Sequence, residues 1–97
     1  MIEIKELSRF EIAFNCKGFF ERDSRYSGVA LCLLRIFIKA MLTEGYGATA
    51  IARVIKMSRR MVYVHGNKAT PLECAFAEEF VANDDFKYNG CLGDYNV

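Results

Sequence analysis

A run of basic residues in the second half of the chain offers the clearest chemistry. Between Gly45 and Pro71 every charged residue is a base, and there are five: Arg53, Lys56, Arg59, Arg60 and Lys68. From Leu72 onward six acids stand against one base, although the whole chain carries a formal net charge of only +1. Bases gathered in one segment attract polyanions, and arginine can pair bidentately with guanine. The pattern predicts a face built for a polyanion.

The basic run coincides with two short predicted helices, which together span residues 47–66. The first covers residues 48–56, the second covers residues 59–65, and Lys56–Met57 turns between them. Ser58 precedes the second helix as an N-cap, because its hydroxyl can accept from an early backbone N–H. The apolar residues expected to face inward are Ile51, Val54, Ile55 and Tyr63. A turn between two helices, followed by a basic leading end, is typical of a helix-turn-helix, whose second helix enters the DNA major groove.

Roles in DNA binding follow from these positions. Ser58, Arg59 and Arg60 form the leading end of the second helix, where side chains reach bases and free N–H groups favour a phosphate. The other basic residues are suited to phosphate contacts that orient the helix on the DNA. Ordinary surface charge is the alternative for each of them, and a carbonyl partner is the alternative for His65. The candidate DNA-binding residues are Arg25, Arg53, Lys56, Ser58, Arg59, Arg60, His65 and Lys68.

The segment GATAIARVIKMSRRMVYVH, from Gly47 to His65, also resembles a family signature. It is similar to S-L-x-E-I-G-x-x-F-G-G-R-D-H-T-T-V-x-H in the C-terminal DNA-binding domain of the bacterial replication initiator DnaA, a helical fold related to the Trp repressor. Ile51, the pair Val54–Ile55 and His65 fall in register. Outside this segment, Ser24–Arg25 resembles the Ser-Arg before the family's long helix. The resemblance implies a helix-turn-helix and a double-stranded DNA partner.

The chain departs from the family where that family reads DNA. The positions of the Asp-His-Thr-Thr run hold Arg59, Arg60, Met61 and Val62. Lys56–Met57 replaces the Gly-Gly turn, and none of residues 31–33, where the family has a basic minor-groove contact, is basic here. The resemblance therefore implies the fold and a DNA site other than the initiator's usual box.

The remaining sequence predicts three more helices. One covers residues 2–14, and a buried one runs from a cap at Asp23 or Ser24 to Glu44, with Arg35 and Lys39 as its one exposed stripe. The third starts at Thr70–Pro71, with Glu73 placed for a capping box, and runs to about Asn83. Its amphipathic face is predicted to comprise Leu72, Ala75, Phe76, Glu79 and Phe80. We expect an all-α single domain, residues 1–97, of about five helices, with a loosely ordered tail over residues 84–97.

Several function classes are disfavoured. The four cysteines, Cys16, Cys32, Cys74 and Cys91, lack metal-ligand spacing, and without an N-terminal signal peptide they read as reduced thiols of a cytoplasmic protein. The longest apolar run, residues 29–42, contains charges and is shorter than the ~20 residues of a membrane helix. No phosphate-binding loop occurs, and His65 has no visible nucleophilic partner. We therefore expect no enzyme activity, no metal and no cofactor.

Two functions remain in view. The first is a non-enzymatic DNA-binding protein related to replication initiators. The alternative is a protein-interaction or regulatory module that keeps the helical fold without binding DNA, which the acidic C-terminal block favours. Phe76, Phe80 and Phe86 are expected in the core, whereas an exposed set of Tyr88, Tyr95 and Val97 would suit a homodimer contact.

Overall fold

The structure is a computed structural model that describes residues 4–21 and 28–88, and within these ranges it contains helices and no strands. A short 3₁₀-helix, η1 (Phe19–Glu21), follows the first of five α-helices, which are α1 (Leu7–Ala13), α2 (Val29–Glu44), α3 (Ala48–Ile55), α4 (Arg59–Asn67) and α5 (Pro71–Ala82). The predicted all-α class is confirmed. None of the described helices is long and apolar enough to cross a membrane.

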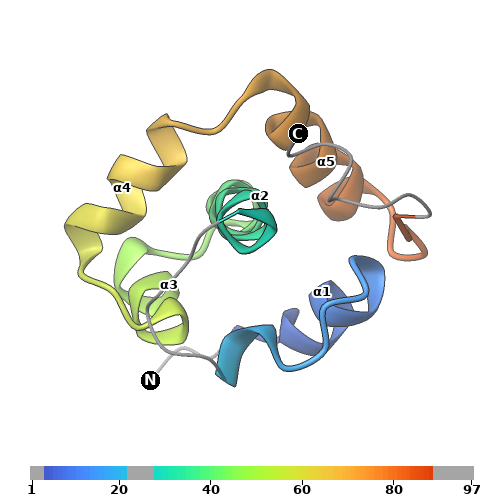
Figure 1. Cartoon of the computed structure of the whole chain (residues 1–97), viewed down its shortest axis with the longest axis horizontal. Coiled ribbons are helices and arrows are strands. Elements are labelled where there is room, and N and C mark those ends of the chain that lie inside the picture. The colour runs from blue at the N-terminus through green and yellow to red at the C-terminus, as the bar shows by residue number, and fades with distance from the viewer. Residues whose placement is uncertain (1–3, 22–27, 89–97) are drawn as a thin grey trace.

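Helix α2 is the centre of the fold. Figure 1 views it end-on, with the other four helices arranged around it. A helix that is apolar on nearly every side must be buried, and the buried residues of α2 are Cys32, Leu33, Leu34, Ile36, Phe37, Ile38, Ala40 and Met41. The helix ends at Gly45, whose φ of 102° is a left-handed cap that glycine adopts readily.

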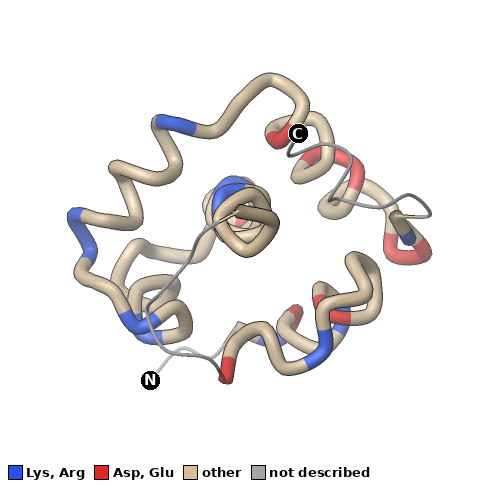
Figure 2. Tube along the Cα trace, viewed as in Figure 1, with Lys and Arg blue, Asp and Glu red and all other residues tan. Residues whose placement is uncertain are grey.

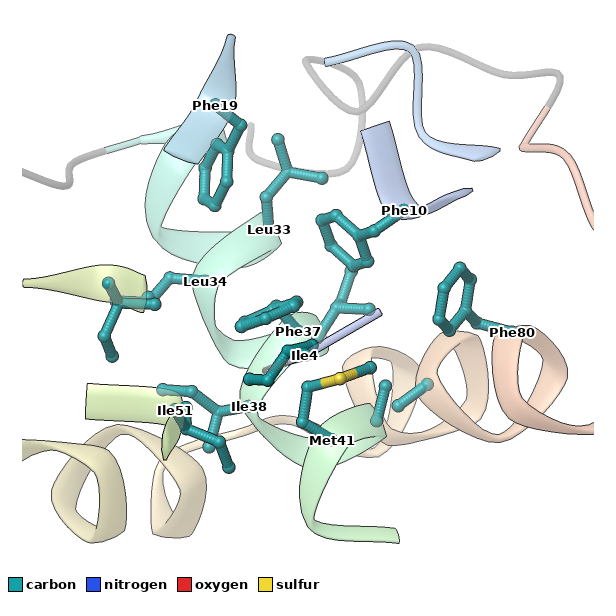
Figure 3. Packing of buried hydrophobic residues seen from close by; sticks show 14 of the residues in the cluster. Ile4, Phe10, Phe19, Leu33, Leu34, Phe37, Ile38, Met41, Ile51 and Phe80 are labelled. Carbon is teal, nitrogen blue, oxygen red and sulfur yellow. The ribbon is translucent and has the colours of Figure 1, made fainter. Parts of the chain in front are cut away.

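Aromatic rings fill the space between α1, α2 and α5. The Phe10 ring meets the Phe37 and Phe80 rings edge-on, with centroids 5.2 and 5.5 Å apart, and all three side chains are fully buried (Figure 3). Arg9 closes this cluster from outside, because its guanidinium lies 4.0 Å from the Phe80 ring centroid and donates to the carbonyl of Asn83. A cation at the C-terminal end of α5 is also favoured by the helix dipole.

Helix α1 is shorter than the helix predicted over residues 2–14. Lys5 and Glu6 form a turn before it, and residues 1–3 lie outside the described residues. The Tyr46 hydroxyl donates to the Glu6 carboxylate at 2.8 Å and accepts from the Lys5 amide at 3.4 Å. These contacts, between residues far apart in sequence, hold the turn in place of another helical turn.

The ends of α2 and α4 also differ from the predictions. Helix α2 begins after Gly28, and the predicted caps at Asp23 and Ser24 lie outside the described residues. The second helix of the basic run was predicted to end at residue 65, yet Gly66 and Asn67 belong to α4. Gly66 is buried, and a Cβ there would lie 3.3 Å from Cγ2 of Ile38. The glycine therefore permits close packing of α4 on α2 instead of stopping the helix.

The predicted capping box of α5 is confirmed. The Thr70 hydroxyl accepts from the Glu73 amide at 3.1 Å, and the Glu73 carboxylate accepts from the Thr70 amide at 2.8 Å. Glu73 is nevertheless fully buried, and its second oxygen lies 3.6 Å from the Arg35 guanidinium. The predicted stripe is present only in part: within residues 32–41, Arg35 and Lys39 alone are not buried, but both are half-buried and Arg35 reaches this carboxylate.

The predicted face of α5 is right at Phe76, which is half-buried, and at Phe80, which is buried, but wrong at three other positions. Leu72, Ala75 and Glu79 are exposed. The buried residues of the helix are Glu73, Ala77 and Phe80.

The first part of the predicted loose tail is packed. Phe86 and Tyr88 are half-buried, the Tyr88 ring lies 5.0 Å from the Phe76 ring, and the Tyr88 amide donates to the Ala13 carbonyl at 2.8 Å. Phe86 follows a turn at residues 84 and 85, and its amide donates to the Asn83 carbonyl at 3.1 Å. Tyr88 is therefore taken up within the fold, and the rest of the tail, with Tyr95 and Val97, lies outside the described residues.

Candidate nucleic-acid interface

Helices α3 and α4 pack against each other and are joined by Lys56, Met57 and Ser58. Lys56 ends α3 in the left-handed conformation, with φ 60°, which costs a side chain that is not glycine roughly 1–2 kcal/mol. The Met57 amide donates to the Ala52 carbonyl, and the Lys56 ammonium donates to the Glu21 carbonyl at 3.4 Å. The turn predicted at Lys56–Met57 is thus present and needs no glycine.

Each of these two helices has a buried inner face and an exposed outer face. Ile51 and Ile55 of α3 and Val62 and Gly66 of α4 are buried. The exposed residues of the two helices are Thr49, Arg53, Arg59, Arg60, Tyr63 and Asn67. At 3.6 residues per turn, Arg60, Tyr63 and Asn67 of α4 fall within an arc of roughly 60° around the helix axis. The outer face of α4 therefore presents arginine, tyrosine and asparagine together.

The start of α4 combines a polar cap with two arginines. The Ser58 hydroxyl accepts from the Met61 amide at 3.3 Å, which confirms the predicted N-cap. Arg59 and Arg60 are the first two helical residues, so their N–H groups have no carbonyl acceptor inside the helix. Helix dipole and side chains are both positive here, and this end of α4 therefore has the properties of an anion site.

The predicted basic residues of α3 and α4 lie on one flank. In Figure 2 the blue segments of these helices follow that flank, whereas red segments lie on α5 and around α1. Arg53 lies in the last turn of α3, Lys56 is its C-cap, and Lys68 is the C-cap of α4. Positive charge at a helix C-terminus is stabilising, so these three have a structural explanation. Arg59 and Arg60, at an N-terminus, have none.

Two other predicted site residues do not join this face. Arg25 lies outside the described residues. His65 is half-buried, and its Nδ1 atom is buried with no hydrogen-bond partner. Burial lowers the pKa of His65 below its ordinary 6.5, and the charges of Arg35 and Lys68 lower it further. Its environment thus favours the neutral imidazole between helices over a contact with an anion.

The inward set predicted for the second helix is wrong at one position. Tyr63 was placed among the inward residues, but its side chain is 55% exposed, while Val62 is fully buried. Val62 therefore cannot serve at a base-reading position. Tyr63 and Asn67 were not predicted to face outward, although their spacing gave a signal: Tyr63 lies four residues after Arg59, and Asn67 four after Tyr63.

An ion pair between a half-buried arginine and a fully buried glutamate lies behind this region. Arg35 of α2 and Glu73 of α5 meet where the short link after α4 enters α5. Cys32 lies in the same cluster, where burial and a hydrogen bond with Glu73 raise the pKa of its thiol. Because Glu73 also caps its own helix through Thr70, one side chain ties the link between α4 and α5 to the central helix.

A recess lies beside α1. It is an open depression of about 550 Å³, and its lining residues are Ser8, Glu11, Ile12, Asn15, Lys17 and Lys87. Within the described residues no three His, Cys, Asp or Glu side chains are grouped to hold a metal ion.

No protein-family model matches the sequence, and no curated protein or solved structure is significantly similar to it.

Proposed function

We propose that this protein binds double-stranded DNA, without catalysis, through the outer face of α3 and α4 acting as a helix-turn-helix. The observation that carries the proposal is the pair Arg59 and Arg60, exposed at the capped start of α4. Positive side chains at a helix N-terminus are repelled by the positive end of the helix dipole, which lowers the stability of the helix. A bound polyanion would be attracted by both the side chains and the dipole.

The dimensions of α4 suit the major groove. Its nine residues span about 13 Å, and a helix of about 10–12 Å diameter fits a groove of about 12 Å. The arginines at its leading end would reach guanine edges or phosphates, as second helices of such motifs do. Arg53 and Lys56 flank that end and Lys68 lies at the other end, and all three would contact the phosphate backbone.

The resemblance to the DnaA DNA-binding domain supports the motif and separates it from the initiator's DNA site. Ile51 and Ile55, two of the positions in register, are buried beneath the proposed face. Arg59 and Arg60 hold base-reading positions with other chemistry, and the buried Val62 cannot read a base. We therefore expect the protein to prefer a sequence other than the initiator box.

A salt titration tests the proposal. Fluorescence anisotropy of a labelled duplex pool should show binding at low salt that weakens steeply as salt rises, since each neutralised phosphate releases counterions. About five phosphate contacts would give a slope of log affinity against log salt near −4 to −5. No binding at low salt would contradict the proposal and favour the protein-interaction module.

A further inference from the structure

We infer that Tyr63 is a specificity-determining residue of this face, and that its ring contacts the 5-methyl group of a thymine. The inference rests on the proposed function, because it names a feature of the DNA that α4 would read. It starts from the exposure of Tyr63, which the spacing of apolar residues does not explain.

Tyr63 differs from the other aromatic residues that the structure describes. All eight phenylalanines, together with Tyr46 and Tyr88, are buried or half-buried, whereas the Tyr63 side chain is 55% exposed. Exposed single apolar residues are common, so exposure alone carries little weight. The neighbours add to it, since Arg59 and Arg60 lie one turn before Tyr63 on the same side of the helix.

The position of Tyr63 along α4 sets which base it would meet. Four residues separate it from Arg59, which is about 6 Å along the helix axis. Successive base pairs are about 3.4 Å apart, so the ring would lie roughly two base pairs from the base read by the arginines. Around the helix Tyr63 lies between Arg59 and Asn67, near the middle of the exposed face of α4.

The chemistry of the groove selects thymine. In a stacked duplex the base faces are covered, and the thymine methyl is the apolar group on the major-groove edge. An aromatic ring can cover that methyl, whereas its hydroxyl could instead donate to a phosphate, which carries no sequence information. The two roles make different predictions for Tyr63→Phe, which keeps the ring and removes the hydroxyl.

The test begins with duplexes that the wild-type protein selects from a random pool. We expect a preferred thymine two or so base pairs from a preferred guanine. Replacing that thymine by uracil removes only the methyl, and should weaken wild-type binding about fourfold, the value for burying one such group. Tyr63→Ala should bind both duplexes equally, Tyr63→Phe should keep the discrimination, and Ile12→Ala, an exposed apolar residue on α1, should behave as wild type.

Several results would overturn the inference. They are a selected site without thymine near the guanine, Tyr63→Ala retaining the fourfold ratio, or Tyr63→Phe losing affinity for all duplexes alike, which would place the hydroxyl on a phosphate. Each leaves DNA binding by the wild-type protein intact. Absence of any salt-sensitive binding by the wild-type protein would instead reject the proposed function, and the inference with it.

Discussion

Helices α4 and α5 begin in opposite ways, although both open with a hydroxyl cap. Ser58 accepts from the Met61 amide and Thr70 from the Glu73 amide, so the two caps are equivalent. After the cap, α5 has proline at its first position and a buried glutamate that completes a capping box and pairs with the half-buried Arg35. After its cap, α4 has two exposed arginines that oppose the helix dipole.

The difference separates residues that serve folding from residues left to serve something else. At the start of α5 every side-chain choice favours the helix and its packing against α2. At the start of α4 only the cap does, and the next two residues are ones that stability disfavours. We therefore expect the functional surface at the start of α4, where exposed basic residues lower the stability of the helix.

The largest expected effect lies at the start of α5. Glu73→Ala removes half of the capping box and the carboxylate partner of the half-buried Arg35, which together should cost about 1–3 kcal/mol. Urea unfolding should show this loss, with Glu78→Ala, an exposed site on the same helix, as the control. A loss below about 1 kcal/mol would mean that the ion pair does not support the fold.

The opposite sign is expected at the start of α4. Replacing Arg59 and Arg60 by glutamate places negative charge at the positive end of the dipole and should stabilise the protein by about 0.3–1 kcal/mol per site. The same unfolding experiment measures it, with Lys17→Glu and Lys87→Glu as the charge-matched control outside the helices. If the α4 variant were less stable than wild type, the arginines would serve the fold, and the contrast between the two starts would disappear.

The smallest effect concerns His65, on the inner side of α4. Its pKa is lowered in the folded protein, chiefly by burial, so the unfolded chain binds a proton more readily. The neutral imidazole therefore contributes stability that is present above the unfolded pKa of 6.5 and is lost as the pH falls below it. Between about pH 7.5 and about pH 5.5, wild type should lose more stability than His65→Gln. Equal losses in the two proteins would show that His65 does not titrate differently on folding.

Local signals predicted most of the fold. The caps at Ser58 and Thr70, the proline at the start of α5 and the apolar character of α2 act within one or two turns, and each appears in the structure. The spacing of apolar residues was a less reliable guide where it had to decide which of two neighbouring residues is buried. Tyr63 and Val62 are neighbours of similar apolar character, and the choice between them depends on how α4 packs on α2.

Other features depended on partners far away in sequence. The ion pair of Arg35 with Glu73 links residues on different helices, and an acid in a first turn normally indicates a solvated cap. The turn at Lys5 and Glu6 is held by Tyr46, which periodicity within residues 2–14 could not reveal. Of the candidate site, the basic residues were visible in the sequence, whereas Tyr63 and Asn67 required the packing of the helix.

The central claim is that Arg59 and Arg60 form the DNA-binding end of α4, and affinity for duplex DNA at fixed low salt tests it most directly. The variant with both arginines changed to alanine is compared with the variant with Lys17 and Lys87 changed to alanine, which removes the same charge elsewhere. We predict that the arginine variant loses at least tenfold in affinity while its fold survives thermal melting, since a bidentate arginine contact is worth about 1–3 kcal/mol. The lysine variant should stay close to wild type. Equal affinities of the two variants would contradict the account.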